Sequence, residues 1–380
     1  MSSGDRPTLA ASPHEPLAHD TGQLTGYLPT LDGWRAVAIG LVLLAHGSES
    51  MQLVFNSPWL AHSALFKQLG LLGVQLFFGL SGFLITSKLL EEEARHGGVS
   101  LRGFYWRRAF RILPASLVFL AVVGALAMAG VLDISLGRWL STLLFAANYS
   151  QAEHSWYLGH FWSLAVEEHF YFLWPLAFVL LGFSQRRVAL ALGLALLVAL
   201  WRALDFKLQI SGATPAQFWG RTDIAVDGIL WGVLLALLYA NAAIRPYLQR
   251  FLTHPLTWPA LAIAVVLVQA MPSLNWKLDF ALISVKAALI PLLILGTLLQ
   301  SNSVKSRLLE SAPFRHVGRL SYSLYLWQQL FLVWNDERVV GLTLVQTFPL
   351  NLLALYLCAS VSLRLIEIPM IALGHRLRKD

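Results

Sequence analysis

Long apolar stretches, separated by short polar connections, run through most of the chain. Each is about 17–25 residues long, enough to cross a hydrocarbon core at about 1.5 Å of helical rise per residue. Backbone groups in lipid need internal partners, and membrane strands would alternate apolar and polar residues. The pattern therefore predicts an all-α, polytopic membrane bundle of about ten transmembrane helices. They are expected near residues 31–52, 69–90, 112–132, 160–181, 187–204, 223–241, 256–271, 281–300, 319–335 and 343–366.

Composition supports a membrane protein, because 57% of the residues are hydrophobic and only 13% are charged. A water-soluble chain of 380 residues would need more charge to cover its surface. The net charge of +7 would also suit a nucleic-acid binder. However, Lys and Arg occupy the short connections, as they do where charge encodes membrane orientation, so no nucleic-acid partner is expected. The single cysteine, Cys358, excludes an internal disulfide.

The basic connections follow the second, fourth, sixth and eighth predicted spans, and the end of the chain is basic too. Under the positive-inside rule they face the cytoplasm, which places both termini there, in a multi-pass protein of the cell (inner or plasma) membrane. Three parts are expected: a disordered cytoplasmic tail over 1–28, a transmembrane domain over 29–370 and a basic cytoplasmic tail over 371–380. The basic residues are Lys88, Arg95, Arg102, Arg107, Arg108, Arg111, Arg186, Arg187, Arg245, Arg250, Lys305, Arg307, Arg315, Arg376, Arg378 and Lys379.

Ionisable side chains inside a membrane are costly and usually mark function. The first span begins with Asp32 and Arg35 and contains His46. Arg35 and His46 share a helix face, separated by roughly 16 Å of rise. This spacing places Arg35 near the cytoplasmic surface and His46 in the outer half of the membrane. The alternatives are that Arg35 extends its charge to the head groups and that His46 is a hydrogen-bonded interfacial histidine.

The fourth predicted span contains two adjacent carboxylates, Glu167 and Glu168. Glu167 is expected at about the depth of His46. A carboxylate beside an imidazole fixes its tautomer and stabilises the cation formed when the ring takes a proton. A catalytic pair is therefore one interpretation, and a structural ion pair between the two spans is the other. Trp162 and Ser163 precede Glu167 and are candidates for a substrate pocket.

Three arginines, Arg107, Arg108 and Arg111, lie close together at the predicted cytoplasmic edge. Guanidinium groups bind phosphate oxygens well, so the cluster suits a phosphate-bearing ligand. The alternative is an orientation signal that contacts anionic lipid head groups.

Two further segments supply pocket candidates. Ser81 lies with Gly79 and Gly82 in a segment of small residues, which suits close helix packing. Tyr322 and Tyr325 share one face of a later helix, where they line a pocket or belong to an aromatic belt.

The polar segments occur in a characteristic order. They are LDGWRA followed by His46, GVQLFFGLSGFLI, FYWRRAFRILP, FWSLAVEEHFYFLWP, SYSLYLWQ and RLIEIP. This ordered set resembles the acyltransferase family 3 membrane proteins, which O-acylate carbohydrates and other secreted or antibiotic molecules. The resemblance covers residues from about 29 to 370.

The resemblance implies that His46 is the family's essential histidine and that Arg35 is its paired arginine. It also implies that Glu167 is the glutamate of the family's tryptophan-serine-leucine segment. The family's cytoplasmic arginine motif is matched by Arg107, Arg108 and Arg111, which favours phosphate contact over the lipid interpretation.

This sequence departs from the family pattern at two positions. Gln75 stands where many members have aspartate, and Gln328 stands where many have histidine. An acidic role at the first position and a second imidazole are therefore not expected. We also expect no SGNH-type hydrolase domain after residue 380, although some members carry one.

The resemblance implies an acyl-CoA donor, with acetyl-CoA the commonest, and no metal. Our hypothesis is that the arginines bind the CoA phosphates and that His46, oriented by Glu167, acts as general base on an acceptor hydroxyl. Direct transfer and an acyl-enzyme both fit. The expected partners are the bilayer and a glycan, lipid-linked or small-molecule acceptor. The alternatives are a transporter or exporter of a small organic solute and a catalytically inactive assembly protein.

Overall fold

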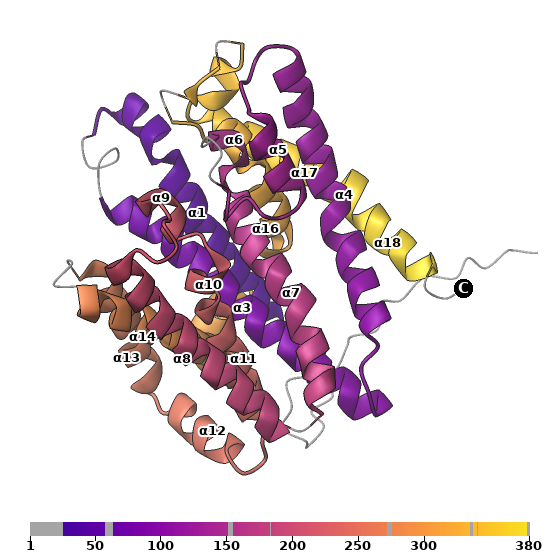
Figure 1. The fold of residues 1–380 in the computed structure, drawn as a ribbon, viewed down its shortest axis with the longest axis vertical. Coiled ribbons are helices and arrows are strands. Elements are labelled where there is room, and N and C mark those ends of the chain that lie inside the picture. The colour runs from indigo at the N-terminus through magenta and orange to yellow at the C-terminus, as the bar shows by residue number, and fades with distance from the viewer. Residues whose placement is uncertain are drawn as a thin grey trace, which may run out of the picture.

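The computed structural model describes residues 26–57, 64–150, 155–182, 184–271, 276–334, 337–339 and 341–377. Every regular element in these ranges is a helix, which confirms the predicted all-α class (Figure 1). The long helices are α1 (Pro29–Phe55), α3 (Ala64–His96), α4 (Leu101–Met128), α7 (Phe161–Leu181), α8 (Ser184–Leu208), α11 (Asp227–Ala240), α13 (Thr257–Ala270), α14 (Trp276–Leu298), α16 (Ala312–Phe331) and α17 (Leu350–Ser362).

Short helices join these long ones. They are α5 (Leu136–Leu143), α6 (Trp156–Gly159), α9 (Pro215–Phe218), α10 (Thr222–Ala225), α12 (Arg245–Thr253), α15 (Val304–Leu309), the 3-10 helix η2 (Thr343–Gln346), the π-helical turn η3 (Leu363–Glu367) and α18 (Ile368–Leu377). The predicted N-terminal tail lies outside the described residues except for its last three, 26–28.

Six helices of the described chain are long and apolar enough to cross a membrane. A seventh span is possible by the same measure if α11 and α12, which meet at a bend of 111°, count as one. A helix lies at each of the ten predicted positions, and this supports a polytopic membrane bundle. Helices α1 and α16 are not among the six, and both carry several ionisable or amide side chains in addition to their apolar residues.

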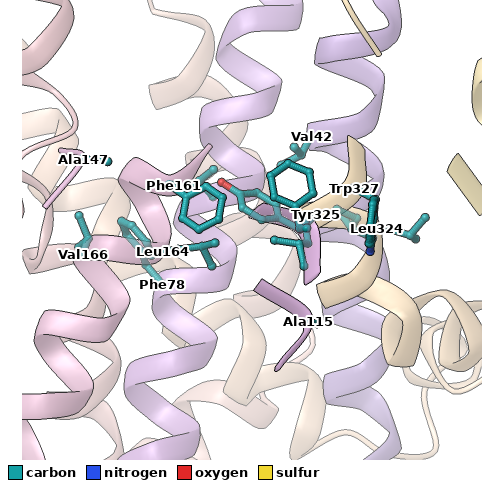
Figure 2. Packing of buried hydrophobic residues seen from close by; sticks show 14 of the residues in the cluster. Val42, Phe78, Ala115, Ala147, Phe161, Leu164, Val166, Leu324, Tyr325 and Trp327 are labelled. Carbon is teal, nitrogen blue, oxygen red and sulfur yellow. The ribbon is translucent and has the colours of Figure 1, made fainter. Parts of the chain in front are cut away.

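The bundle is centred on α1, α3 and α16. Helix α1 packs against α3 and α16, and α3 also packs against α11. Buried apolar side chains fill the centre of the bundle, among them Val42 of α1, Phe78 of α3, Leu164 of α7 and Tyr325 of α16 (Figure 2). This packing brings residues that are nearly 300 positions apart in sequence into contact, such as His46 and Gln328.

Close contact between these helices depends on glycine at specific positions. A Cβ atom at Gly82 of α3 would lie 2.0 Å from the carbonyl oxygen of Ile229 in α11. A Cβ atom at Gly318 of α16 would lie 1.9 Å from the carbonyl oxygen of Asp32 in α1. Any larger residue would push these backbones apart, so the small-residue segment of α3 is a packing surface, as predicted.

Candidate active site

A cavity of about 270 Å³ lies between α1, α3, α4, α7 and α16, and we call it the arginine cavity. Four cationic side chains line it, together with one carboxylate, Glu167, and several hydroxyl groups. The cationic residues are Arg35, Lys88, Arg108 and Arg111, and the hydroxyl residues are Ser81, Ser163, Tyr171, Ser321, Tyr322 and Tyr325. Cations outnumber carboxylates in the lining, which suits an anionic ligand, although Arg35, Lys88 and Arg108 each pair with a carboxylate outside the lining.

The arginines differ in how firmly the protein holds them. Arg35 pairs with Asp32 at 2.8 Å, one turn earlier on α1. The Arg108 guanidinium lies 3.3 Å from the centroid of the Tyr171 ring, and its Nε is 3.7 Å from Glu168. Arg111 is exposed at the cavity wall, so its guanidinium is available to a ligand.

Glu167 is held within the wall of the arginine cavity. The Ser81 hydroxyl donates to its Oε1 at 2.7 Å, and the Tyr171 hydroxyl donates to Ser81 at 2.8 Å. Tyr322 donates to the Ile112 carbonyl at 2.9 Å and is also hydrogen-bonded to Ser116. These bonds fix the polar wall of the cavity before any ligand binds.

A second cavity, of about 490 Å³, contains His46, and we call it the histidine cavity. The Nδ1 atom of His46 lies 2.9 Å from Oε1 of Gln328, which is completely buried. When Oε1 accepts this hydrogen bond, Nδ1 carries the ring proton and Nε2 keeps its lone pair. Trp156 packs against the imidazole edge to face, with the ring centroids 5.3 Å apart. The bond to Gln328 therefore leaves Nε2 free to act as a base.

The histidine cavity contains a second imidazole, His160. Both its backbone nitrogen and its Nδ1 lie within hydrogen-bonding distance of Oε1 of Gln329, at 3.3 and 3.1 Å. The expectation of a single imidazole, based on glutamine at position 328, is therefore wrong. His160 supplies the second ring from α7, directly before the FWSLAVEE segment. The sequence signal was its place in that segment, but only the tertiary structure shows that it faces the cavity of His46.

The two cavities meet at two residues, Val74 and Tyr325, which line both. At this junction the Tyr325 hydroxyl is hydrogen-bonded to Ser163 at 2.5 Å. Arg35 lines one cavity and His46 the other, although both belong to α1. The site therefore has a cationic compartment and an imidazole compartment in contact.

The prediction that His46 contacts Glu167 is wrong, because the two residues lie in different cavities. Glu167 lines the arginine cavity and is bonded to Ser81, whereas His46 lines the histidine cavity and is bonded to Gln328. Helical rise gives the depth of a residue, but it does not give the neighbour that a helix face meets. The face of α1 that carries His46 meets α16, so an amide and not a carboxylate holds the ring.

The remaining predicted residues divide between the two cavities. Ser81, Ser163 and Tyr322 line the arginine cavity, Trp162 lines the histidine cavity, and Tyr325 lines both. Of the three clustered arginines, Arg108 and Arg111 line the arginine cavity. Arg107 instead pairs with Glu92 at 3.0 Å and is not part of the lining. Within the described ranges, no group of three or more His, Cys, Asp or Glu side chains is placed to hold a metal ion.

Comparison with known proteins identifies the class of this chain. A family model described as an acyltransferase domain matches residues 28–363, which is most of the sequence. The chain belongs to this family, the membrane acyltransferase family 3.

Individual relatives are O-acetyltransferases by name. O-acetyltransferase OatA from Staphylococcus aureus (strain NCTC 8325 / PS 47) is 28% identical over 377 residues, covering 92% of this chain and 58% of the relative. A putative O-acetyltransferase from Staphylococcus aureus (strain COL) is 28% identical over 364 residues, covering 90% of this chain and 57% of the relative. The chain thus spans less than two thirds of the length of these relatives. No solved structure is detectably similar to it.

Proposed function

We propose that the chain is a membrane O-acyltransferase that moves an acetyl group from acetyl-CoA to a hydroxyl group of a carbohydrate acceptor. The observation that carries this proposal is the junction of the two cavities at Val74 and Tyr325. It gives a phosphate-bearing donor and a hydroxylated acceptor separate compartments that share a boundary. The names of the relatives support acetyl as the transferred group.

The donor occupies the arginine cavity in this proposal. Arg35, Arg108 and Arg111 bind the phosphates of CoA, because guanidinium groups bind phosphate oxygens in a bidentate, charge-assisted geometry. The pantetheine arm then extends past Tyr325, and this brings the thioester to the histidine cavity. Arg35 and His46 are separated by roughly 16 Å of helical rise, a distance that an extended arm of this kind spans.

His46 acts as the general base in direct transfer. Its Nε2 takes the proton of the acceptor hydroxyl while the hydroxyl oxygen attacks the thioester carbonyl. A carbon–oxygen bond forms, the carbon–sulfur bond breaks, and the proton passes from Nε2 to the departing CoA thiolate. Gln328 keeps the ring in the tautomer that this step needs.

The lining of the histidine cavity supports a carbohydrate acceptor. Three tryptophans, Trp156, Trp162 and Trp334, line it together with the two imidazoles. Tryptophan offers a large apolar face with one polar edge, which suits a ring that carries both C–H faces and hydroxyl groups.

The membrane orientation completes the proposal. We propose ten spans with both termini in the cytoplasm, because the basic connections alternate along the chain. Lys88 of α3 and Arg108 and Arg111 of α4 lie on either side of one of these connections, so in this proposal the arginine cavity faces the cytoplasmic pool of acetyl-CoA.

The test uses the purified protein in lipid nanodiscs with radiolabelled acetyl-CoA and hydroxylated acceptors. Release of CoA should accompany labelling of the acceptor. The His46→Ala variant should lose this activity by about 10²–10⁴-fold, the usual contribution of a general base. His316→Ala is the matched control, because His316 is bonded to Tyr356 and lines neither cavity. Acetylation retained in a folded His46→Ala protein contradicts the role of His46. Movement of an unmodified solute without CoA release favours transport.

A further inference from the structure

We infer that His160 recognises a second hydroxyl group of the acceptor and thereby determines which acceptors are used. This inference rests on the proposed function. It concerns a residue to which neither the family resemblance nor the general-base step gives a role. Three observations carry it: the fixed tautomer of the ring, the unpartnered Nε2 atom, and the position of the ring in the cavity of His46.

The tautomer of His160 follows from its contacts with Gln329. The backbone N–H of His160 is a donor and lies 3.3 Å from Oε1 of Gln329. The contacting atom of Gln329 is therefore the amide oxygen, because the amide nitrogen would meet a donor with a donor. The same oxygen lies 3.1 Å from Nδ1, so Nδ1 carries the ring proton. Nε2 is left as a hydrogen-bond acceptor.

The Nε2 atom of His160 has no hydrogen-bond partner among the described residues. The residue is 2% exposed, so bulk water does not satisfy the lone pair. A buried polar atom without a partner costs free energy, and such atoms in native structures call for a physical explanation. A ligand hydroxyl that donates to Nε2 supplies the missing bond. The ring lines the histidine cavity, and because Nε2 itself is buried, a ligand hydroxyl reaches it when a neighbouring side chain moves aside.

The two imidazoles of the histidine cavity are held in the same way by adjacent residues. Gln328 bonds Nδ1 of His46, and Gln329 bonds Nδ1 of His160. Both rings therefore present an Nε2 lone pair. One lone pair takes the proton of the reacting hydroxyl, and the other is left for a hydroxyl that does not react. This arrangement fits an acceptor with at least two hydroxyl groups close together, as in a pyranose, and disfavours a simple alcohol.

The experiment compares methyl β-D-glucopyranoside with its monodeoxy derivatives as acceptors, using the full chain in nanodiscs. For the wild type, removal of one particular non-reacting hydroxyl should lower kcat/KM by about tenfold or more, because a site built around a hydroxyl rejects the analogue that lacks it. The His160→Phe variant should lose a similar factor with the parent glucoside. It should also no longer distinguish the parent from that deoxy derivative. The KM for acetyl-CoA should stay within about twofold.

The His160→Gln variant is a second test, since its amide oxygen can accept the same hydrogen bond. It should recover part of the discrimination between the parent glucoside and the deoxy derivative. If His160→Phe does not fold, this variant alone decides the outcome. A purely structural role would slow all acceptors equally, so discrimination retained in both variants overturns the inference while the proposed function stands. Failure of the wild type to acetylate any of the glucosides overturns the proposed carbohydrate transfer, and with it this inference.

Discussion

Gln328 and Gln329 are adjacent on α16, and each bonds a different imidazole of the histidine cavity. Amides hold a ring tautomer without adding charge of their own, although Glu49 and Lys67 also line this cavity. The arginine cavity uses the opposite chemistry, because its guanidinium groups outnumber its single carboxylate, Glu167. The partners of these polar groups therefore match their proposed roles: amides orient the imidazoles that meet the acceptor, and guanidinium groups bind the phosphates of the donor.

The first prediction concerns the support of His46. Gln328→Leu removes the acceptor that fixes Nδ1–H, so acetyl transfer should fall by about tenfold or more as the ring loses its tautomer and position. Gln328→Glu keeps an oxygen at this place and should retain more activity than Gln328→Leu. The control is Gln249→Leu, because Gln249 is hydrogen-bonded to Tyr239 and lines neither cavity. Initial rates of CoA release measure all three, and equal rates for Leu and Glu at position 328 would contradict the role.

The second prediction separates two neighbouring arginines. Arg111→Gln should raise the KM for acetyl-CoA by about tenfold or more, because a hydrogen bond to a charged group contributes about 1.5–3 kcal/mol. Arg107→Gln should change it by less than about twofold, since Arg107 pairs with Glu92 and lies outside the cavity lining. Steady-state kinetics with varied acetyl-CoA give both values. A larger rise in the KM for acetyl-CoA in Arg107→Gln than in Arg111→Gln would contradict a donor site in the arginine cavity.

Helix α3 lies between α1 and α11 in the bundle. It packs against α1 on one face and against α11 on another. It also contributes Val74 to both cavities and Ser81 to the wall that holds Glu167. Its glycines set the spacing to α11, so the packing of this one helix positions residues of both compartments.

The third prediction tests that spacing. Gly82→Ala would place a Cβ atom 2.0 Å from the Ile229 carbonyl oxygen, so the two helices must separate. The expected loss is about 1–3 kcal/mol in the free energy of unfolding, the usual cost of overpacking. Tryptophan fluorescence during thermal unfolding in detergent measures the change. Gly193→Ala in α8 is the control, because nothing lies within 4 Å of its Cβ position, and it should not lower the melting temperature.

The whole molecule combines a polytopic bundle with two cavities that meet inside it. The long apolar helices give the protein its place in the membrane, and the polar residues concentrate where α1, α3, α7 and α16 converge. A donor and an acceptor that approach from opposite sides of the bilayer would meet at Val74 and Tyr325. The proposed reaction therefore requires the proposed orientation, with the arginine cavity on the cytoplasmic side.

The fourth prediction tests that orientation. Replacing the single cysteine with Cys358→Ser gives a background free of cysteine. Gly98→Cys, in the exposed connection between α3 and α4, should react with a membrane-impermeant maleimide only after the cells are opened. Ile210→Cys, in the exposed turn just after α8, should react in intact cells. Labelling of both positions from the same side would rule out the proposed span arrangement.

The helical membrane class was predictable from sequence, because lipid leaves the backbone no alternative to internal hydrogen bonds. The residue types of the candidate site were predictable too, since ionisable groups within apolar membrane segments, such as Arg35, His46 and Glu167, are costly and usually mark function. Arg108 and Arg111 line a cationic cavity, and the phosphate contact expected of them stays a prediction.

Only the tertiary structure decided which of these residues meet. It placed Gln328 and not Glu167 against His46, brought His160 into the same cavity, and set Arg107 apart from Arg108 and Arg111. The physical reason is that helical period and rise fix the depth and direction of a side chain on its own helix. The neighbour it meets depends on how whole helices pack, and that depends on contacts such as Gly82 with Ile229 and Gly318 with Asp32.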